Sequence, residues 1–250
     1  MNGEALTQIL RESHHIVFFG GAGVSTASGI PDFRSSDGLF NARLNRHFTP
    51  EQLVSHTYFE GYPEDFYTFY KDKLVYPEAV PNGCHLALAK LEAMGKLKAV
   101  ITQNIDGLHQ KAGSQVVYEL HGSVLRNYCT QCHAFYDETF ILSAKGIPRC
   151  VHCGGVVKPD VVLYEEGLDN QVIDGAIRAI SKADTLIIGG TSLVVYPAAG
   201  LIDYFRGKHL VLINKSTTSA DNRADVVIHE DIAGVMTAAV AALESEAVVK

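Results

Sequence analysis

The chain has 250 residues, of which 47% are hydrophobic, and a formal net charge of -7 at pH 7. This length suffices for one large domain or for a core with a small appendage. A negative chain without a long basic block does not favour direct binding of nucleic acid. Residues 1–15 lack a signal-peptide core, and no apolar run approaches the roughly 20 residues of a membrane helix. We therefore expect a cytoplasmic monomer that binds no membrane.

Short apolar runs rich in β-branched or aromatic residues alternate with helical patterns along the chain. Continuous apolar strands separated by helices are typical of a parallel sheet that is covered on both faces. We therefore predict an α/β fold with a doubly wound, Rossmann-like core. The expected strands are 15–20, 97–102, 116–120, 185–190, 209–214 and 225–229, and the clearest helical patterns are 84–95, 169–184 and 232–243.

Two stretches interrupt this alternation. Residues 35–83 are rich in aromatic and polar side chains, and a helix start is expected where Thr49 can cap, Pro50 can open the first turn and Gln52 can complete a capping box. Residues 122–157 hold four of the five cysteines. We expect a single domain with a helical insertion and a zinc module. Its core would comprise about 1–34, 84–121 and 158–250, the insertion about 35–83 and the module about 122–157.

The cysteines form the most specific local pattern. Cys129 and Cys132 make one C-x-x-C pair, and Cys150 and Cys153 make a second pair after residues 133–149. This spacing is typical of a zinc site with four thiolate ligands, which is closed and hence structural. Disulfides and a redox pair are alternatives, and the missing secretion signal disfavours disulfides. The fifth, Cys84, is expected to be a small buried residue.

A glycine-rich segment, "GGAGVSTASGIPDFR", follows the first strand at residues 20–34. Gly21, Ala22 and Gly23 are small enough for backbone N–H groups to approach a phosphate, with help from the positive end of a following helix. The spacing is not G-x-G-x-x-G, and no second strand ends in an acid about 20 residues further on. The segment thus indicates a nucleotide more than hydride transfer, although Pro31 and Asp32 could simply form a turn.

The second expected strand runs into "QNIDGLHQKAG" at residues 103–113. Asn104 or Asp106 could cap a helix that ends at Gly113. Alternatively, Gln103, Asn104 and Asp106 could form a catalytic edge, and this segment alone does not decide between the two. His121 also follows a strand, where a histidine without a catalytic role is the commoner case.

Taken together, six segments resemble the sirtuins, which are NAD-dependent protein-lysine deacylases. The resemblance covers residues 10–235 and is closest to bacterial sirtuins with little beyond the catalytic core. It implies acyl transfer from lysine to ADP-ribose, with release of nicotinamide and O-acyl-ADP-ribose. NAD+ would be consumed as a cosubstrate, and one Zn2+ would be structural. The segments are "GAGVSTASGIPDFR", "TQNIDGLHQKAGS", "ELHGS", the two cysteine pairs, "KPDVVLYEE" and "GTSLVVYPAA".

The resemblance also assigns roles to individual residues. His121 would be the general base, Gln103 and the catalytic Asn104 would line the ribose, and Ile105 and Asp106 would meet the carboxamide of nicotinamide. Other residues implied to bind the cofactor are Ala22 and Thr26 near the phosphates, Phe33 over the reactive ribose carbon, Arg34, Thr191 and Ser192 at the distal phosphate and ribose, and Asn214, Asp231 and Ile232 at the adenosine.

The implied partner is an acyl-lysine protein that adds as a strand between residues 161–165 and 190–196. Glu165 stands where the family often has glycine, and it could favour basic substrates or point into solvent. Tyr70 and Lys73 resemble a Tyr-x-x-Arg pattern for acidic acyl groups, but lysine lacks the planar fork of arginine, so we expect acetyl-lysine to be preferred over succinyl-lysine. The substrate-binding residues implied by the resemblance are Val161, Val162, Leu163, Tyr164, Glu165 and Val194.

Two other functions are compatible with parts of this pattern. A non-catalytic sensor of NAD or ADP-ribose could use the zinc module to contact another protein, but His121, Asn104 and Asp106 are all present. Mono-ADP-ribosylation of proteins shares the first bond-breaking step and differs in the acceptor. The sequence separates this second alternative poorly from deacylation.

Overall fold

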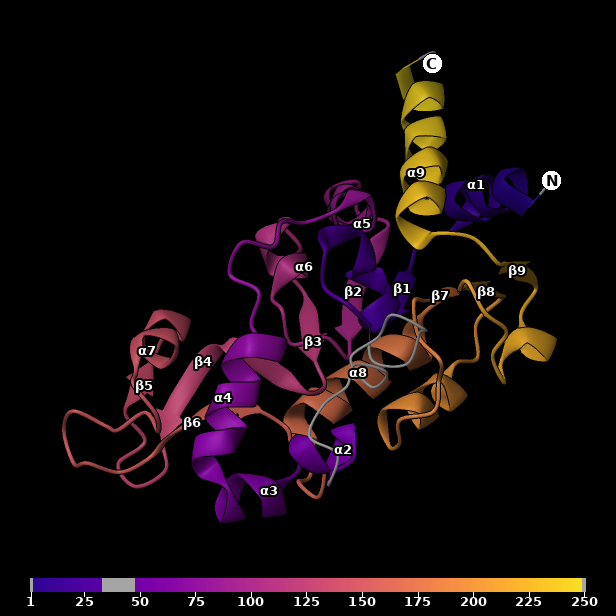
Figure 1. Ribbon diagram of the computed structural model, residues 1–250. Helices are drawn as coiled ribbons and strands as arrows, with labels where there is room; N and C mark the ends of the chain where they lie inside the picture. The colour runs from indigo at the N-terminus through magenta and orange to yellow at the C-terminus, as the bar shows by residue number, and fades with distance from the viewer. Residues whose placement is uncertain (1, 33–47, 249–250) are drawn as a thin grey trace.

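The computed structural model describes residues 2–32 and 48–248 of the chain. A six-stranded sheet forms its centre in the order β3-β2-β1-β7-β8-β9, and all its neighbouring strands are parallel (Figure 1). Each predicted apolar run contributes one strand, which confirms the fold class. The strands are β1 (Ile16–Gly20), β2 (Leu97–Thr102), β3 (Val117–Glu119), β7 (Thr185–Gly189), β8 (His209–Ile213) and β9 (Val226–Ile228).

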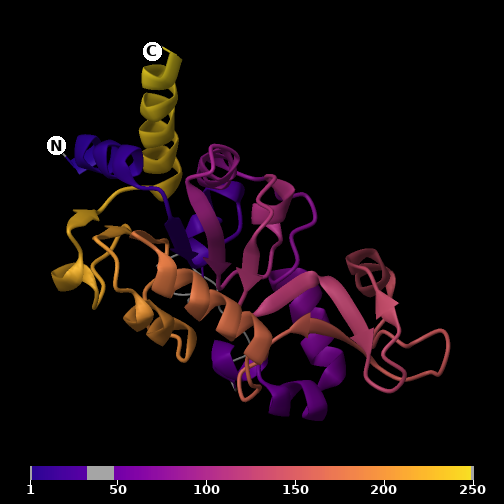
Figure 2. The same ribbon diagram turned by 180° about the vertical axis from the view of Figure 1, so that it is seen from behind.

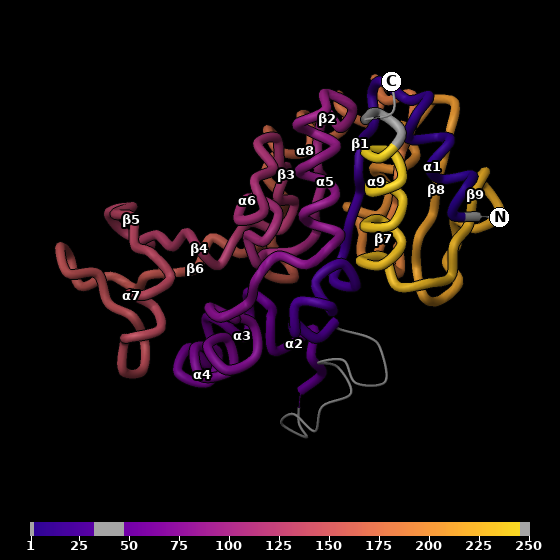
Figure 3. Tube along the Cα trace, turned by 90° about the horizontal axis from the view of Figure 1, so that it is seen from above, coloured from indigo at the N-terminus to yellow at the C-terminus, as the bar shows by residue number. Residues whose placement is uncertain are grey.

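Helices cover both faces of this sheet. Helices α1 (Asn2–Glu12), α5 (Gly83–Ala93) and α9 (Ile232–Val248) pack on one face, where α1 lies beside α9 (Figure 3). Helix α8 (Asn170–Lys182) and the 3-10 helix η4 (Ala198–Tyr204) pack on the other (Figure 2). Consecutive residues of a strand face opposite sides, so Phe18 contacts the first layer and Phe19 the second. This two-sided burial explains why the strands are apolar without alternation.

The two interrupting stretches form one small lobe beside the core (Figure 1). Its described part contains a three-stranded antiparallel sheet and four short helices that share one apolar cluster. The predicted capping box is present, since Thr49 and Gln52 exchange hydrogen bonds at the start of α2. The small sheet runs to Val161, beyond residue 157. The elements are α2 (Pro50–Leu53), α3 (His56–Gly61), α4 (Pro63–Lys73), β4 (Gly122–Cys129), β5 (Phe135–Tyr136), α7 (Glu138–Ser143) and β6 (Val157–Val161).

Arg126 joins the small sheet to the core sheet and also bridges two strands of the small sheet. Arg126 on β4 donates through Nη1 to Glu119 on β3 at 2.6 Å and through Nε to Asp160 on β6 at 2.9 Å. Gly122 has φ of 74°, and a Cβ there would lie 1.9 Å from the carbonyl oxygen of Asp160. Only glycine permits this backbone conformation together with so close an approach. The direction of β4 relative to β6 is therefore fixed beside His121.

The strand order reverses between β1 and β7, because β1 to β3 extend the sheet one way and β7 to β9 the other. Open parallel sheets bind ligands at such a point, outside the carboxyl ends of the strands. No helix within residues 2–32 and 48–248 is long and apolar enough to cross a membrane.

Candidate active site

A cavity of about 980 Å³ lies at the carboxyl edge of the six-stranded sheet and extends to the small lobe. The segments that follow β1, β2, β3, β7 and β8 all contribute to its wall. The exposed Val194 is not part of the lining, and Phe33 and Arg34 lie outside the described residues. The predicted site residues that do line it are Ala22, Thr26, Gln103, Asn104, Ile105, Asp106, His121, Val161, Val162, Leu163, Tyr164, Glu165, Thr191, Ser192, Asn214, Asp231 and Ile232.

The glycine-rich segment after β1 packs tightly on the end of β7. The N–H of Gly23 donates to the carbonyl of Gly190 at 2.8 Å, and a Cβ on Gly23 would lie 2.9 Å from the Gly190 Cα. The segment forms two short 3-10 helices, η1 (Ala22–Val24) and η2 (Thr26–Ser28), where the sequence indicated a turn between a strand and a helix. Its small residues therefore serve close backbone packing as well as an open cavity wall.

Ser25 links Asn104 to Asp106 at the centre of the cavity. Its hydroxyl donates to Asp106 Oδ2 at 2.6 Å and accepts from Asn104 Nδ2 at 3.0 Å. The other carboxylate oxygen of Asp106 accepts from the N–H of Leu108 at 2.9 Å, at the start of α6 (Leu108–Lys111). Asp106 therefore bonds to the first turn of α6 with one oxygen and to Ser25 with the other, and a catalytic role for this edge stays a prediction.

His121 is held in one tautomer by the backbone. Its Nδ1 lies 2.9 Å from the carbonyl oxygen of Gln103, which can only accept, so Nδ1 carries the hydrogen. In the neutral ring Nε2 is then the atom that can accept a proton. Burial lowers the pKa of His121 from its ordinary value of 6.5, against the opposing effect of the bond to Gln103. The imidazole is therefore neutral and able to act as a base at neutral pH.

Two further side chains, those of Gln103 and Thr191, form the cavity wall after β2 and β7. Gln103 Nε2 donates to the hydroxyl of Thr191 at 3.1 Å, and the same hydroxyl accepts from the N–H of Leu193 at 3.2 Å. These bonds connect residues from two strand ends of the core sheet. They hold the predicted ribose-binding and phosphate-binding positions in one rigid surface.

The segment after β6 runs between the core and the helical insertion. The N–H of Val162 donates to the carbonyl of His121, and Tyr164 exchanges backbone hydrogen bonds with Val54 and His56. Ser55 and Tyr164 form a parallel β-bridge. Residues 161–164 therefore run beside the candidate base and pair with the insertion, and Glu165 begins a turn.

The four cysteines of the small lobe converge on one point. Their sulfur atoms all lie within 4.8 Å of one another, with 3.4 Å between Cys129 and Cys153 and 3.5 Å between Cys132 and Cys150. Tetrahedral zinc with bonds of about 2.3 Å requires comparable sulfur separations. Tyr136 donates its hydroxyl hydrogen to Cys150 Sγ at 3.1 Å, as an outer partner of a metal thiolate does. This arrangement fits one Zn2+ and leaves no ligand position for substrate.

The cavity also contains residues that the sequence analysis did not assign. Ser25 lies within the quoted "GAGVS" stretch, but the sequence does not show that it contacts Asp106. Lys215 and Glu230 contribute to the wall beside Asn214 and Asp231. Nothing in their local sequence distinguishes them from ordinary surface charges.

The fold and the site define a parallel α/β protein with a dinucleotide-sized cavity and a separate four-cysteine metal site. The Sir2 family profile matches residues 21–197. The chain therefore belongs to the Sir2 family.

Comparison with known proteins agrees with this assignment. The chain is 72% identical to the NAD-dependent protein deacetylase of Clostridium perfringens (strain 13 / Type A), over 92% of this chain and 95% of that protein. It is 47% identical to the protein of the same description from Staphylococcus aureus (strain NCTC 8325), over 93% and 96% of the two chains.

Solved structures of Sir2 proteins have the same fold. One described as a Sir2 homolog–NAD complex has a TM-score of 0.86 and 38% identity, covering 97% of this chain and 94% of that chain. A Sir2 variant with a deacetylated p53 peptide and 3′-O-acetyl-ADP-ribose has a TM-score of 0.87 and 37% identity, covering 95% and 97%.

Proposed function

We propose that this chain is an NAD-dependent protein-lysine deacetylase in which His121 is the general base. Its relatives carry that activity in their names, and solved Sir2 structures hold NAD or an acetylated ADP-ribose product. The observation that carries the assignment of His121 is its tautomer, because the bond from Nδ1 to Gln103 leaves Nε2 as the accepting atom in the cavity. A base of this type fits proton removal near neutral pH.

The proposed roles follow from the contacts of each residue. NAD, when bound, supplies an ADP-ribosyl acceptor, so that lysine is freed and nicotinamide and O-acyl-ADP-ribose are the products. Asn104 and Asp106 are oriented by Ser25 and would hold the ribose and the carboxamide. His121 Nε2 would take a proton from the ribose hydroxyls. Gln103 would keep the imidazole in the required tautomer while lining the ribose.

The remaining predicted positions complete the proposed site. Ala22, Thr26, Thr191 and Ser192 would surround the phosphates and distal ribose, and Asn214, Asp231 and Ile232 the adenosine. Phe33 and Arg34 keep their proposed roles, over the ribose carbon and at the cofactor. The acyl-lysine segment would add as a strand along residues 161–165, with Val194 on its opposite side. We further propose that the protein is a cytoplasmic monomer with one catalytic domain and one structural zinc ion.

The test is to incubate the protein with NAD and an acetyl-lysine peptide and to follow all products by mass spectrometry. Deacetylation predicts loss of the acetyl group from the peptide and an equal amount of O-acetyl-ADP-ribose. A gain of ADP-ribose by the peptide, or by the enzyme, would instead indicate mono-ADP-ribosylation. Binding of ADP-ribose without consumption of NAD would identify a sensor and contradict the proposal.

A further inference from the structure

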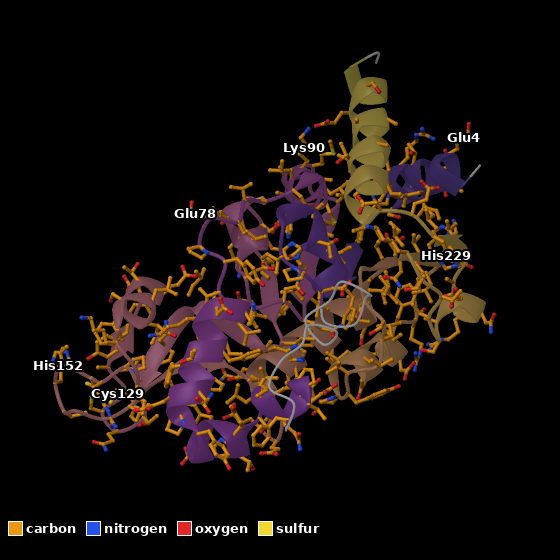
Figure 4. The ribbon with its side chains drawn as sticks, viewed as in Figure 1. Glu4, Glu78, Lys90, Cys129, His152 and His229 are labelled. Atoms are coloured by element: carbon orange, nitrogen blue, oxygen red, sulfur yellow. The ribbon has the colours of Figure 1, made fainter. Side chains whose placement is uncertain are left out.

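A second histidine, His229, joins two chain segments that form one wall of the cavity. Residues 214–216 follow β8, residues 230–232 follow β9, and both segments line the cavity. His229 lies between them in the sequence and at the opposite end of the molecule from Cys129 (Figure 4). Its place beside the segment that carries Asn214 suggests a role in the geometry of that wall.

Both ring nitrogens of His229 face acceptors. Nδ1 lies 2.9 Å from the carbonyl oxygen of Asn214, and Nε2 lies 3.2 Å from Oδ2 of Asp221. The second oxygen of Asp221 accepts from the N–H and the hydroxyl of Thr218, each at 2.8 Å. Hydrogen bonds from Thr218 lower the pKa of Asp221, so its carboxyl group is ionised near neutral pH. A carbonyl and a carboxylate can both be satisfied only when both ring nitrogens carry hydrogen.

A hydrogen bond to the carbonyl of Asn214 affects the orientation of the Asn214 side chain. The side-chain Nδ2 of Asn214 donates to the carbonyl of Ser216 at 2.7 Å, which leaves its Oδ1 as the acceptor for a ligand. Lys215 Nζ lies 3.3 Å from Asp231 Oδ1, so a second contact spans the same two segments. Through the Asn214 carbonyl, His229 fixes the peptide unit next to the Asn214 side chain.

We propose that His229, held between the Asn214 carbonyl and Asp221, is a positioning residue that fixes Asn214 for the adenosine end of NAD. This inference rests on the proposed function, which places Asn214, Asp231 and Ile232 at the adenosine. His229 acts through Asn214 and touches no reacting atom. Other charged groups of this region are Glu230 and Asp231 after β9, Lys215 after β8, and Arg223 of η5 (Asp221–Arg223), which pairs with Asp203 of η4.

The test compares the wild type with His229→Leu and Asp221→Asn. The Kd of ADP-ribose is measured by titration calorimetry, and steady-state kinetics give KM for NAD, KM for an acetyl-lysine peptide and kcat. We expect the Kd of ADP-ribose and the KM for NAD to rise about 5- to 10-fold in each variant, as for a lost charge-assisted hydrogen bond at a part-exposed site. The kcat at saturating NAD and the KM for the peptide should stay within about twofold. The substitutions weaken cofactor binding equally in the ground state and the transition state, which raises KM without changing kcat.

Two further variants separate positioning from general damage. The double variant should bind no more weakly than His229→Leu alone, because residues that act as one unit are not additive. His14→Leu, which removes an exposed imidazole just before β1, is the matched control and should bind as the wild type does.

Equal ADP-ribose affinity in the wild type and in both variants would overturn the inference. So would a fall in kcat with no change in the KM for NAD, or full additivity in the double variant. If His229→Leu does not fold, Asp221→Asn decides the result. Failure of the proposed function is distinguishable, because the wild type would then form no O-acetyl-ADP-ribose while the binding measurements remain informative.

Discussion

Oε2 of Glu165 accepts hydrogen bonds from both the backbone N–H and the hydroxyl of Thr57, at 2.9 Å and 2.7 Å. These bonds lower the pKa of Glu165. The sequence left open whether this carboxylate favours basic substrates or points into solvent. The residue is exposed, but its carboxylate is bound to the first turn of α3. Its φ of 78° lies in the left-handed region, which explains why glycine suits this position.

This contact predicts an order of stability among three proteins. Glu165→Ala should melt at a lower temperature than either the wild type or Glu165→Gly, because alanine keeps the strained backbone and loses both hydrogen bonds. Thermal denaturation followed by circular dichroism measures this order. Thr57→Val is the matched control, because it removes the hydroxyl bond, keeps the backbone N–H bond and leaves the strained residue unchanged. An alanine variant more stable than the glycine variant would contradict the strain argument.

The metal site predicts a structural phenotype. Cys129→Ser should give an unstable or insoluble protein, since loss of one thiolate opens a closed site that supports the small lobe. Zinc content, solubility and melting temperature provide the measurements. Cys84→Ala serves as control, because this buried thiol lies in the core cluster and should leave bound zinc unchanged. A well-folded, zinc-free Cys129→Ser variant with normal turnover would show that the metal has no structural role.

The proposed base predicts which step a substitution affects. His121→Ala should keep measurable affinity for NAD while deacetylation falls by at least roughly 100-fold, as for a lost general base. Exchange of labelled nicotinamide into NAD should survive better, because it needs only the first step. Parallel assays of exchange and of O-acetyl-ADP-ribose formation test this difference. If both vanish together in a folded protein, His121 acts earlier than proposed.

Two buried histidines predict how stability depends on pH. His85 and His109 lie with ring centroids 4.7 Å apart, and burial lowers the pKa of His85 to about 4 and that of His109 to about 3. The unfolded chain therefore binds more protons below the ordinary value of 6.5, so stability is lost as the pH falls from there toward 4.

Urea denaturation at pH 7 and at pH 5 provides the measurement for this histidine pair. The wild type should have a clearly lower midpoint at pH 5. In His109→Phe the loss between the two pH values should be smaller, because one of the two groups no longer titrates. The exposed His14→Phe variant should retain the dependence of the wild type. An equal loss in all three proteins would assign the acid sensitivity to other groups.

The acyl preference now has a structural basis. Lys73 lines the cavity and its Nζ lies 2.9 Å from Asp72, whereas Tyr70 is buried, is not part of the lining, and its hydroxyl has no hydrogen-bond partner among the described residues. A hydrogen bond from Tyr70 to an acyl carboxylate therefore has no support in this structure. Acetyl-lysine should be the better substrate than succinyl-lysine.

The measurement is kcat/KM on one peptide that carries each acyl group in turn. Lys73→Met should leave deacetylation nearly unchanged, because an acetyl group offers no charge for Lys73 to bind. If succinyl-lysine is preferred, Lys73 binds the acyl carboxylate in place of the arginine of the Tyr-x-x-Arg pattern. Lys73→Arg should then strengthen that preference and Lys73→Met should abolish it.

The sequence predicted the core well for a physical reason. Strands such as residues 185–189 are buried on both faces, so their composition alone marks them. The cysteine pairs were equally clear, because short spacing constrains where the sulfur atoms can lie. The contact of Ser25 with Asp106 could not be predicted, since it depends on two strand ends meeting across the sheet. The bond from Thr57 to Glu165 likewise depends on how the insertion packs against the segment after β6.

His121 occupies the single position between Leu120, which pairs with the end of β2, and Gly122, the first residue of β4. The proposed base is thus the residue that connects the core sheet to the small sheet, and its imidazole is held by the Gln103 carbonyl. The zinc module therefore cannot be exchanged independently of the residues at its junction with the core sheet. A chimera that grafts a relative's module onto this core would have to retain Gly122, Asp160 and Arg126 together, and a junction placed inside residues 119–122 would disturb catalysis even if zinc still bound.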